Sequence, residues 1–150
     1  MCFEIRKAVP RDLHAALQLD KEAFGVDAWY ILDYAGAFSF RGIKKFTALV
    51  GGKFAGFAAA EYDPGRKAVC LMTLAVRPEF RKKGIGTALL KRCEEAFTQT
   101  KYYLTVDCEN LSAIRLYEYN GYRHTGVIHA YYLNGHDAFE MEKDTDKCRI

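Results

Sequence analysis

The chain lacks the features that would place it outside the globular proteins. No apolar run reaches the roughly 18 residues that a membrane-spanning helix needs, and the start has no signal-peptide core. The five cysteines include no C-x-x-C pair, and their odd number does not suit a disulfide framework. We therefore expect a cytoplasmic protein of the reducing cytosol that has no membrane association.

Length and charge set further limits. The 150 residues predict one domain over residues 1–150, and 50% hydrophobic residues suffice for a core. The net charge of +3 is too small to indicate nucleic acid by itself. A compact basic cluster keeps that alternative open, but Glu94 and Glu95 follow it at once; its members are Arg77, Arg81, Lys82, Lys83 and then Lys91 and Arg92. We expect no nucleic-acid partner.

Hydrophobic periodicity predicts strands mixed with helices. Strand patterns occupy residues 3–8, 46–50, 54–61, 69–76, 102–107, 122–132 and 138–142. Helical spacings occupy residues 10–24, 27–40, 87–97 and 111–120. Gly51-Gly52 and Asn134-Gly135 are typical of hairpin turns. This order predicts an α/β fold: a mixed, partly splayed sheet of about six or seven mostly antiparallel strands with about four flanking helices.

The most informative stretch is Arg81-Lys82-Lys83-Gly84-Ile85-Gly86-Thr87, between an apolar strand and a helix. Its glycines permit a tight turn with outward amides, and the helix N-terminus adds partial positive charge. Such a turn binds phosphate or pyrophosphate. A Walker A loop is excluded because no Gly-Lys-Ser/Thr follows at the required spacing, and a Rossmann fingerprint lacks its third glycine. A plain helix-capping turn with a basic surface is the alternative.

Two segments carry a family resemblance. The run from Leu74 to Leu90 closely resembles the acetyl-CoA-binding motif of the GNAT N-acetyltransferases. The run Asn110-Leu111-Ser112-Ala113-Ile114-Arg115-Leu116-Tyr117-Glu118-Tyr119-Asn120-Gly121-Tyr122 is similar to the family's N-x-x-A-x-x-L-Y-E-x-x-G-F/Y block. The resemblance implies the GNAT fold and acetyl-CoA as cosubstrate, with no metal.

The resemblance also implies roles for individual residues. The pantetheine arm is expected to pair with the backbone of Leu74, Ala75 and Val76 and with the Asn110 side chain. The pyrophosphate is expected at Arg81, Lys82, Lys83, Gly84, Ile85, Gly86 and Thr87. Tyr117 is expected to bind near the thioester and to protonate the leaving thiolate. From the residues alone, Asn110 is equally a helix N-cap and Tyr117 an ordinary core residue.

The acceptor side resembles the RimI-type protein N-terminal acetyltransferases. The ending Tyr131-Tyr132-Leu133-Asn134-Gly135-His136-Asp137-Ala138-Phe139-Glu140-Met141 is similar to their "YY…G-x-D-A-x-x-M". Phe24 and Trp29 are similar to an early segment of that group, although Gly25 replaces its proline. The resemblance implies that Phe24, Trp29, Tyr131 and Tyr132 wall the substrate groove. The two tyrosines alone would be read as an aromatic pair on a strand.

The general base expected from the resemblance is absent. RimI-type enzymes carry a glutamate where this chain has Thr105, and histone-type relatives carry one where it has Cys70. Asp107 points to the same sheet face as Thr105, about 7 Å away, and is the candidate base, with Glu61 and Glu109 as further candidates. The alternative is proton loss through water, and we predict that Asp107→Asn leaves most activity. A loss above about a hundredfold would identify Asp107 as the base.

These observations predict direct acetyl transfer from acetyl-CoA to a primary amine, by a monomer or homodimer. An α-amine is about 2.5 pKa units easier to deprotonate than a lysine, or roughly 3.4 kcal/mol, which favours a protein or peptide N-terminus. A polyamine, amino acid or aminoglycoside is the first alternative acceptor. A non-catalytic acetyl-CoA sensor is the second. We expect no acetyl-cysteine intermediate, since neither Cys70 nor Cys108 belongs to a clear Cys-His arrangement.

Overall fold

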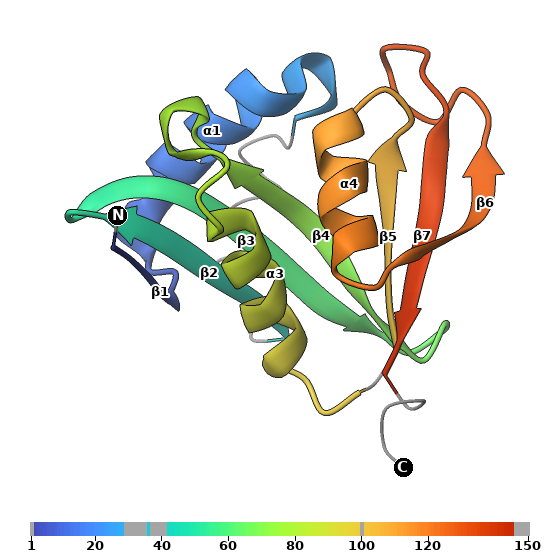
Figure 1. The fold of residues 1–150 in the computed structure, drawn as a ribbon, viewed down its shortest axis with the longest axis horizontal. Helices are drawn as coiled ribbons and strands as arrows, with labels where there is room; N and C mark the ends of the chain where they lie inside the picture. The colour runs from blue at the N-terminus through green and yellow to red at the C-terminus, as the bar shows by residue number, and fades with distance from the viewer. Residues whose placement is uncertain (1, 29–35, 37–41, 100, 146–150) are drawn as a thin grey trace.

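The computed structural model describes residues 2–28, 36, 42–99 and 101–145 (Figure 1). Its strands are β1 (Phe3–Lys7), β2 (Ile43–Val50), β3 (Lys53–Asp63), β4 (Ala68–Val76), β5 (Lys101–Asp107), β6 (Arg123–Ile128) and β7 (Ala138–Asp144). Its α-helices are α1 (Leu13–Phe24), α3 (Ile85–Glu95) and α4 (Leu111–Tyr119). Short 3₁₀ turns occupy Pro10–Asp12, Gly25–Asp27 and Pro78–Phe80. The helix predicted at 27–40 falls largely outside the described residues.

All seven strands form one sheet in the order β1-β2-β3-β4-β5-β7-β6. Every neighbouring pair is antiparallel except β4 and β5, which run parallel. The continuous apolar run of β4 is explained by its central place, since both faces of this strand are covered. The prediction of a mixed, mostly antiparallel sheet is confirmed.

The sheet opens between β4 and β5. Among the described residues these strands pair at Val69 with Tyr102 and at Cys70 with Tyr103, and they then diverge towards their carboxyl ends (Figure 1). The pairing of β3 with β4 shifts between Ala59 and Ala60, where β4 has Met72 as an extra residue. A bulge bends its strand and increases local twist. The divergence leaves the backbone of β4 beyond Cys70 without a strand partner on the β5 side.

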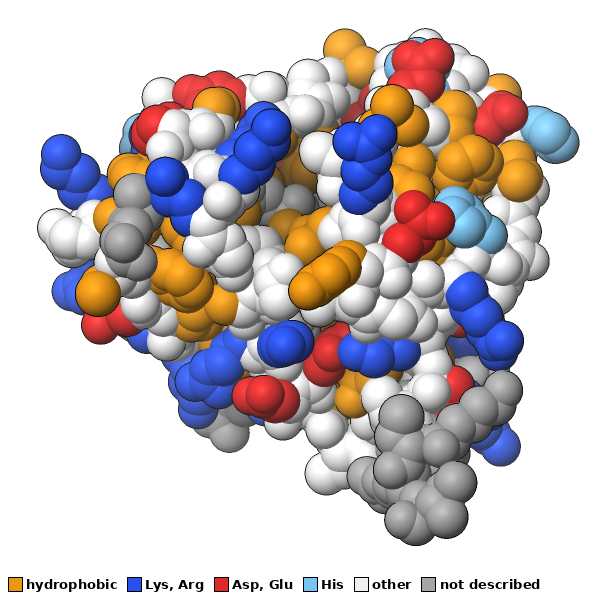
Figure 2. Space-filling model, viewed as in Figure 1, with side chains coloured by type: hydrophobic (Ala, Val, Ile, Leu, Met, Phe, Trp, Pro, Cys, Tyr) orange, Lys and Arg blue, Asp and Glu red, His pale blue; other side chains and the backbone are white. Residues whose placement is uncertain are grey.

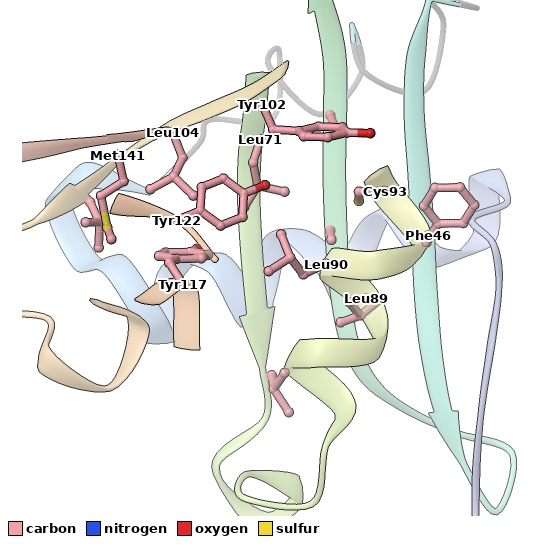
Figure 3. Packing of buried hydrophobic residues seen from close by; sticks show 14 of the residues in the cluster. Phe46, Leu71, Leu89, Leu90, Cys93, Tyr102, Leu104, Tyr117, Tyr122 and Met141 are labelled. Atoms are coloured by element: carbon pink, nitrogen blue, oxygen red, sulfur yellow. The ribbon is translucent and has the colours of Figure 1, made fainter. Parts of the chain in front are cut away.

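Helices cover both faces of the sheet. α3 and α4 lie on one face, over a core in which Leu89 and Leu90 are fully buried (Figure 3). α1 covers the other face, where its Ala16 packs with Ile43, Phe57 and Ala59. The two-residue period of β5 explains the division, since alternate residues from Tyr102 to Val106 are buried in the first core.

Gly56 of β3 lies where both β4 and α3 pack against β3. A Cβ built at this glycine would lie 2.9 Å from the carbonyl oxygen of Ala75 and 3.2 Å from Leu89 Cδ1. Those distances are shorter than ordinary van der Waals contact. The absence of a side chain at Gly56 therefore allows β4 and α3 to pack against β3.

A buried carboxylate fixes the start of α1 to the sheet. Asp12 is 6% exposed and accepts hydrogen bonds from Arg6 Nη1 (2.7 Å), the Val9 amide (2.8 Å) and Thr47 Oγ1 (3.0 Å). Burial alone would raise the pKa of Asp12, but these donors outweigh burial and hold that pKa below its usual value. The ionised Asp12 therefore links β1, β2 and the first turn before α1.

The strand predicted at 122–132 is wrong in its second half. β6 ends at Ile128, and Ala130 adopts a positive φ of 49°. Asp137 Oδ1 accepts the Ala130 amide at 2.8 Å, so a side chain takes this donor from the sheet ladder. Tyr131 and Tyr132 consequently lie in the β6–β7 loop rather than on a strand.

Candidate active site

The divergence of β4 and β5 forms one large cleft, with a volume of about 1380 Å³. Its walls come from the end of α1, the second half of β4, the loop before α3, the end of β5, α4 and the β6–β7 loop. In Figure 2, Lys and Arg side chains flank a hollow on the face that carries α3 and α4. Segments far apart in sequence therefore meet around a single binding space.

One end of the cleft is built to bind an anion. Gly84 is the N-cap of α3 with a φ of +86°, and no described side chain caps the helix. The first amides of a helix have no acceptor within it, so this uncapped N-terminus presents donors and partial positive charge. Arg81, Lys82 and, from α4, Arg115 add cationic side chains to the lining.

Within this loop the residues divide by role. Gly84, Ile85, Gly86 and Thr87 line the cleft together with Arg81 and Lys82, whereas Lys83 is exposed and outside the described lining. Arg81 Nε donates to the Val76 carbonyl at 3.0 Å and so fixes the loop to the end of β4. Gly86 has a packing reason as well, because a Cβ there would lie 3.2 Å from Leu116 Cδ2. That glycine lets α3 and α4 lie close together.

The middle of the cleft is the wall formed by β4. Leu74, Ala75 and Val76 all line it, on the side where β4 has lost β5 as a partner. Asn110 lines the cleft opposite and caps α4, since its Oδ1 accepts the Ala113 amide at 3.3 Å. The cap confirms one reading of Asn110 and leaves its amide nitrogen available to a ligand.

Tyr117 of α4 joins the core to the cleft. Its side chain is 6% exposed and its ring packs edge-on against Tyr122, with centroids 5.9 Å apart (Figure 3). The described residues offer its hydroxyl no hydrogen-bond partner, and the residue lines the cleft. Burial raises the pKa of Tyr117, so the hydroxyl keeps its proton at neutral pH. It can therefore act as a proton donor.

The other end of the cleft is aromatic and acidic. Phe24, Tyr131 and Tyr132 line it, and the two tyrosine rings meet edge-on at 4.9 Å. Burial is the main cause that raises the pKa of Tyr132 to about 12. Three carboxylates, those of Asp27, Asp107 and Glu109, surround His136 in the same region. The carboxylate of Asp20 is 1% exposed and accepts a hydrogen bond from Thr73 Oγ1 of β4. Trp29 lies outside the described residues.

Asp27 connects two walls of the acidic end. Its Oδ1 accepts the amide of Leu133 at 2.7 Å, which ties the turn after α1 to the β6–β7 loop. Its Oδ2 is buried with no hydrogen-bond partner among the described residues. Buried carboxylate oxygens are seldom left unpaired, so Asp27 adds unsatisfied acceptor capacity beside the cleft.

Asp107 is already bound by three donors from its surroundings. Its carboxylate accepts the Glu109 amide at 2.9 Å and Asn134 Nδ2 at 3.0 Å, and both its oxygens lie within 3.0 Å of His136 Nδ1. Asp107 and Thr105 share a sheet face, as the strand period predicts, and both line the cleft. Glu61 is outside the described lining.

Comparison with known proteins identifies the family. The model of the acetyltransferase (GNAT) family matches residues 11–122. The chain belongs to the GNAT acetyltransferases. An uncharacterized N-acetyltransferase of Methanocaldococcus jannaschii is 34% identical over 143 residues, which cover 93% of this chain and 90% of that protein. An N-alpha-acetyltransferase of Sulfurisphaera tokodaii is 37% identical over 75 residues, or 47% of this chain and 45% of that protein.

A solved structure agrees with this assignment. The ribosomal-protein-S18-alanine N-acetyltransferase of Escherichia coli superposes with a TM-score of 0.82 at 26% identity, covering 95% of this chain and 94% of the other. The predicted GNAT family, its fold and its likeness to RimI-type members are confirmed. This GNAT protein is an acyltransferase that uses acetyl-CoA to acetylate an amine.

Three further observations bear on this GNAT enzyme. Burial raises the pKa of Cys70, and neither Cys70 nor Cys108 is among the described residues lining the cleft, so neither thiol is placed to attack a thioester. No group of three described His, Cys, Asp or Glu side chains is placed to hold a metal ion. No described helix is long and apolar enough to cross a membrane.

Sequence reasoning missed Arg115, Asp27 and His136 as cleft residues. Arg115 and Asp27 carry no local signal, because a charged residue on a helix or turn is usually a solvated one. His136 follows the Asn134-Gly135 turn, and its position beside Asp107 depends on the pairing of β5 with β7. That pairing was predicted only as membership of one sheet.

Proposed function

We propose that this GNAT enzyme acetylates the N-terminal α-amine of a protein or peptide. The observation that carries the proposal is the charge division of the cleft, which is basic at the N-terminus of α3 and acidic beside the β6–β7 loop. An acetyl-CoA pyrophosphate suits the basic end. A protonated amine suits the carboxylates at the other end.

The rim of the acidic end favours a chain over a compact amine. The exposed fractions of Val26, Tyr131 and Leu133 are 62%, 51% and 75%. Val26 precedes Asp27 in the chain, the Leu133 amide donates to Asp27, and Tyr131 is one of the two paired tyrosines. Exposed apolar side chains around a polar pocket are typical of surfaces that bind another chain. Relatives named N-alpha-acetyltransferase support the same acceptor.

In this proposal the donor lies along β4. The backbone of Leu74, Ala75 and Val76 binds the pantetheine arm, aided by Asn110. The pyrophosphate is bound by cationic side chains and amides of the loop before α3 and of the first turn of α3: Arg81, Lys82, Gly84, Ile85, Gly86 and Thr87. The exposed Lys83 adds positive charge outside the cleft lining. Phe24, Tyr131 and Tyr132 wall the acceptor.

The transfer is direct. The neutral amine attacks the thioester carbon, the C–S bond breaks, and Tyr117 gives its proton to the sulfur. The nitrogen loses its remaining extra proton, which restores Tyr117. Burial of Tyr117 supports this role, because a high pKa keeps the hydroxyl protonated until a thiolate forms.

A small polyamine is the second candidate, because the carboxylates of Asp27, Asp107 and Glu109 gather in one region of the cleft. The test is a thiol-release assay with acetyl-CoA on two sets of acceptors. One set holds short peptides with free N-termini and no lysine, together with their N-terminally blocked forms. The other holds spermidine, free amino acids and an aminoglycoside. We expect turnover of free peptides alone, and a preference for spermidine would contradict the α-amine assignment.

A further inference from the structure

An imidazole–carboxylate pair, His136 with Asp107, lies at the acidic end of the cleft, in a chain that lacks both standard glutamates. The β6–β7 loop brings His136 to the carboxyl end of β5, where its Nδ1 lies 2.9 and 3.0 Å from the two oxygens of Asp107. Asp107 is itself fixed by the Glu109 amide and Asn134 Nδ2. The position of the His136 ring is therefore set by a carboxylate that two other donors already hold in place.

This contact decides which ring nitrogen is free. Asp107 accepts a hydrogen bond from Nδ1–H, so the lone pair of neutral His136 lies on Nε2. Nε2 is 3.2 Å from Glu109 Oε2, but Glu109 is 69% exposed and this contact is an ion pair without hydrogen-bond geometry. His136 is 36% exposed and lines the cleft with Thr105, Tyr117 and Tyr132. An acceptor amine in the cleft can displace Glu109 from Nε2.

We propose that His136 is the general base, receiving a proton from the acceptor amine at Nε2, and that Asp107 is the residue that positions it. The proposal rests on the direct transfer to an amine proposed above. It reassigns the candidate base from Asp107 to a residue that Asp107 holds. Thr105 and Cys70 then need no carboxylate, because the proton acceptor comes from the β6–β7 loop.

The surroundings favour a protonated ring. The hydrogen bond to Asp107 is the first cause that raises the pKa of His136 above 6.5, and the charges of Asp107, Glu109 and Asp27 add to it. Asp137, the next residue, is a further carboxylate close by. Burial alone would raise the pKa of Asp107, but its donors hold it lower, so it stays ionised. A base with a pKa moved towards the roughly 7.7–8.0 of an α-amine is well matched to it.

The protons balance through His136 and Tyr117. His136 Nε2 takes one proton from the ammonium group, which frees the nitrogen lone pair for attack on the thioester carbon. The new C–N bond leaves a second extra proton on nitrogen, and that proton replaces the one that Tyr117 gives to the departing sulfur. The imidazolium then releases its proton to water, so each turnover frees one proton.

The chain contains a matched control. His129 lies in the same loop and pairs through Nδ1 with Asp137 at 3.3 Å, but its side chain is 86% exposed and it is outside the described cleft lining. His129→Gln therefore removes an imidazole–carboxylate pair from the loop without touching the cleft. His136→Gln and Asp107→Asn are the test variants.

The experiment measures kcat/KM from pH 5.5 to 9.5 by thiol release, with acetyl-CoA affinity measured by calorimetry for each variant. Wild type and His129→Gln should rise with one ionisation and then level off. His136→Gln should lose about a hundredfold near pH 7 with unchanged acetyl-CoA affinity, and the loss should shrink as the amine deprotonates itself. In place of the small loss expected from the sequence alone, Asp107→Asn should lower activity by about tenfold, less than His136→Gln does, and should lower the NMR-measured pKa of His136.

Recovery of activity on adding imidazole separates a base from a residue with a purely structural role, because free imidazole can replace a missing base but not a missing packing contact. His136→Ala should regain activity with imidazole, whereas Asp107→Asn should not. A His136→Gln enzyme within about twofold of His129→Gln, or a pH-independent loss without imidazole rescue, would overturn the proposal. The comparison uses whichever amine the enzyme acetylates, so failure of the α-amine assignment leaves this test intact.

Discussion

Replacement of Gly56 by alanine should weaken the fold at the point where β3, β4 and α3 meet. The added Cβ would lie 2.9 Å from a backbone oxygen, that of Ala75, and 3.2 Å from Leu89 Cδ1. The leucine end can rotate away, but the Ala75 carbonyl moves only if β4 moves. We therefore expect a displaced β4 rather than a local side-chain adjustment.

The magnitude follows from two opposing effects. Gly→Ala lowers the entropy of the unfolded chain, which stabilises a protein by about 0.4–1 kcal/mol where the site accepts the methyl group. Overpacking a full core costs about 1–3 kcal/mol. Gly56→Ala should therefore lose about 1–2 kcal/mol net of unfolding free energy. Gly126 of β6 is the matched control, because a Cβ there would lie 3.6 Å from Glu140 Oε2, an ordinary contact.

Thermal unfolding at one pH and protein concentration measures both variants against wild type. Gly56→Ala should lower the thermal midpoint by about 2–8 °C, whereas Gly126→Ala should leave it unchanged or slightly higher. Because Ala75 borders the cleft, acetyl-CoA should also bind Gly56→Ala more weakly. A Gly56→Ala protein as stable as Gly126→Ala would refute the argument from close packing.

Three other outcomes are expected. Tyr117→Phe should lower kcat by about a hundredfold with little change in stability, since the ring contact with Tyr122 survives, and a preserved kcat in the thiol-release assay would contradict its role as the acid. Asp12→Asn should lose about 3 kcal/mol at pH 7 in urea unfolding. The pKa of Asp12 is lower in the folded state than in the unfolded state. The extra unfolding free energy of wild type over Asp12→Asn is therefore present above about pH 4 and disappears as the pH falls through the folded pKa. A stability difference that persisted in acid would refute this linkage. Gly84→Ala should lower the free energy of unfolding by about 1–2 kcal/mol, because a φ of +86° strains any residue with a Cβ even though no described atom lies in its way. Unchanged thermal stability would argue against that strain.

The parts of the fold that sequence predicts are those set by local periodicity. The runs that became β3, β4, β5, α3 and α4 were each found within a few residues, because buried faces impose a period of two or 3.6 on the sequence. The end of β6 was missed because a tertiary contact decides it. The Asp137 side chain accepts the Ala130 amide and ends the strand pairing before Tyr131.

The candidate site was predictable where a motif shares its backbone geometry with the family. The loop before α3, the second half of β4 and the α4 segment with Asn110 and Tyr117 all line the cleft. The sequence did not predict contacts between residues that lie far apart in the chain. The contact of Asp107 with His136 spans 29 residues, and that of Asp27 with Leu133 spans 106, so no local pattern contains either. Gly86 was assigned to the ligand, although a Cβ there would also crowd Leu116 Cδ2 at 3.2 Å.

The short pairing of β4 with β5, at two residue pairs, also affects how the two halves of the sheet separate during partial unfolding. On one side of it stand β1 to β4, and on the other β5, β7 and β6, with few ladder hydrogen bonds joining them. Cooperative units of a protein separate where such bonds are fewest. The two halves of the sheet are therefore natural foldons, and amides of β6 and β7 should exchange through openings smaller than global unfolding. A donor molecule bound across the gap would act as a brace between them, so acetyl-CoA would slow exchange in both halves at once.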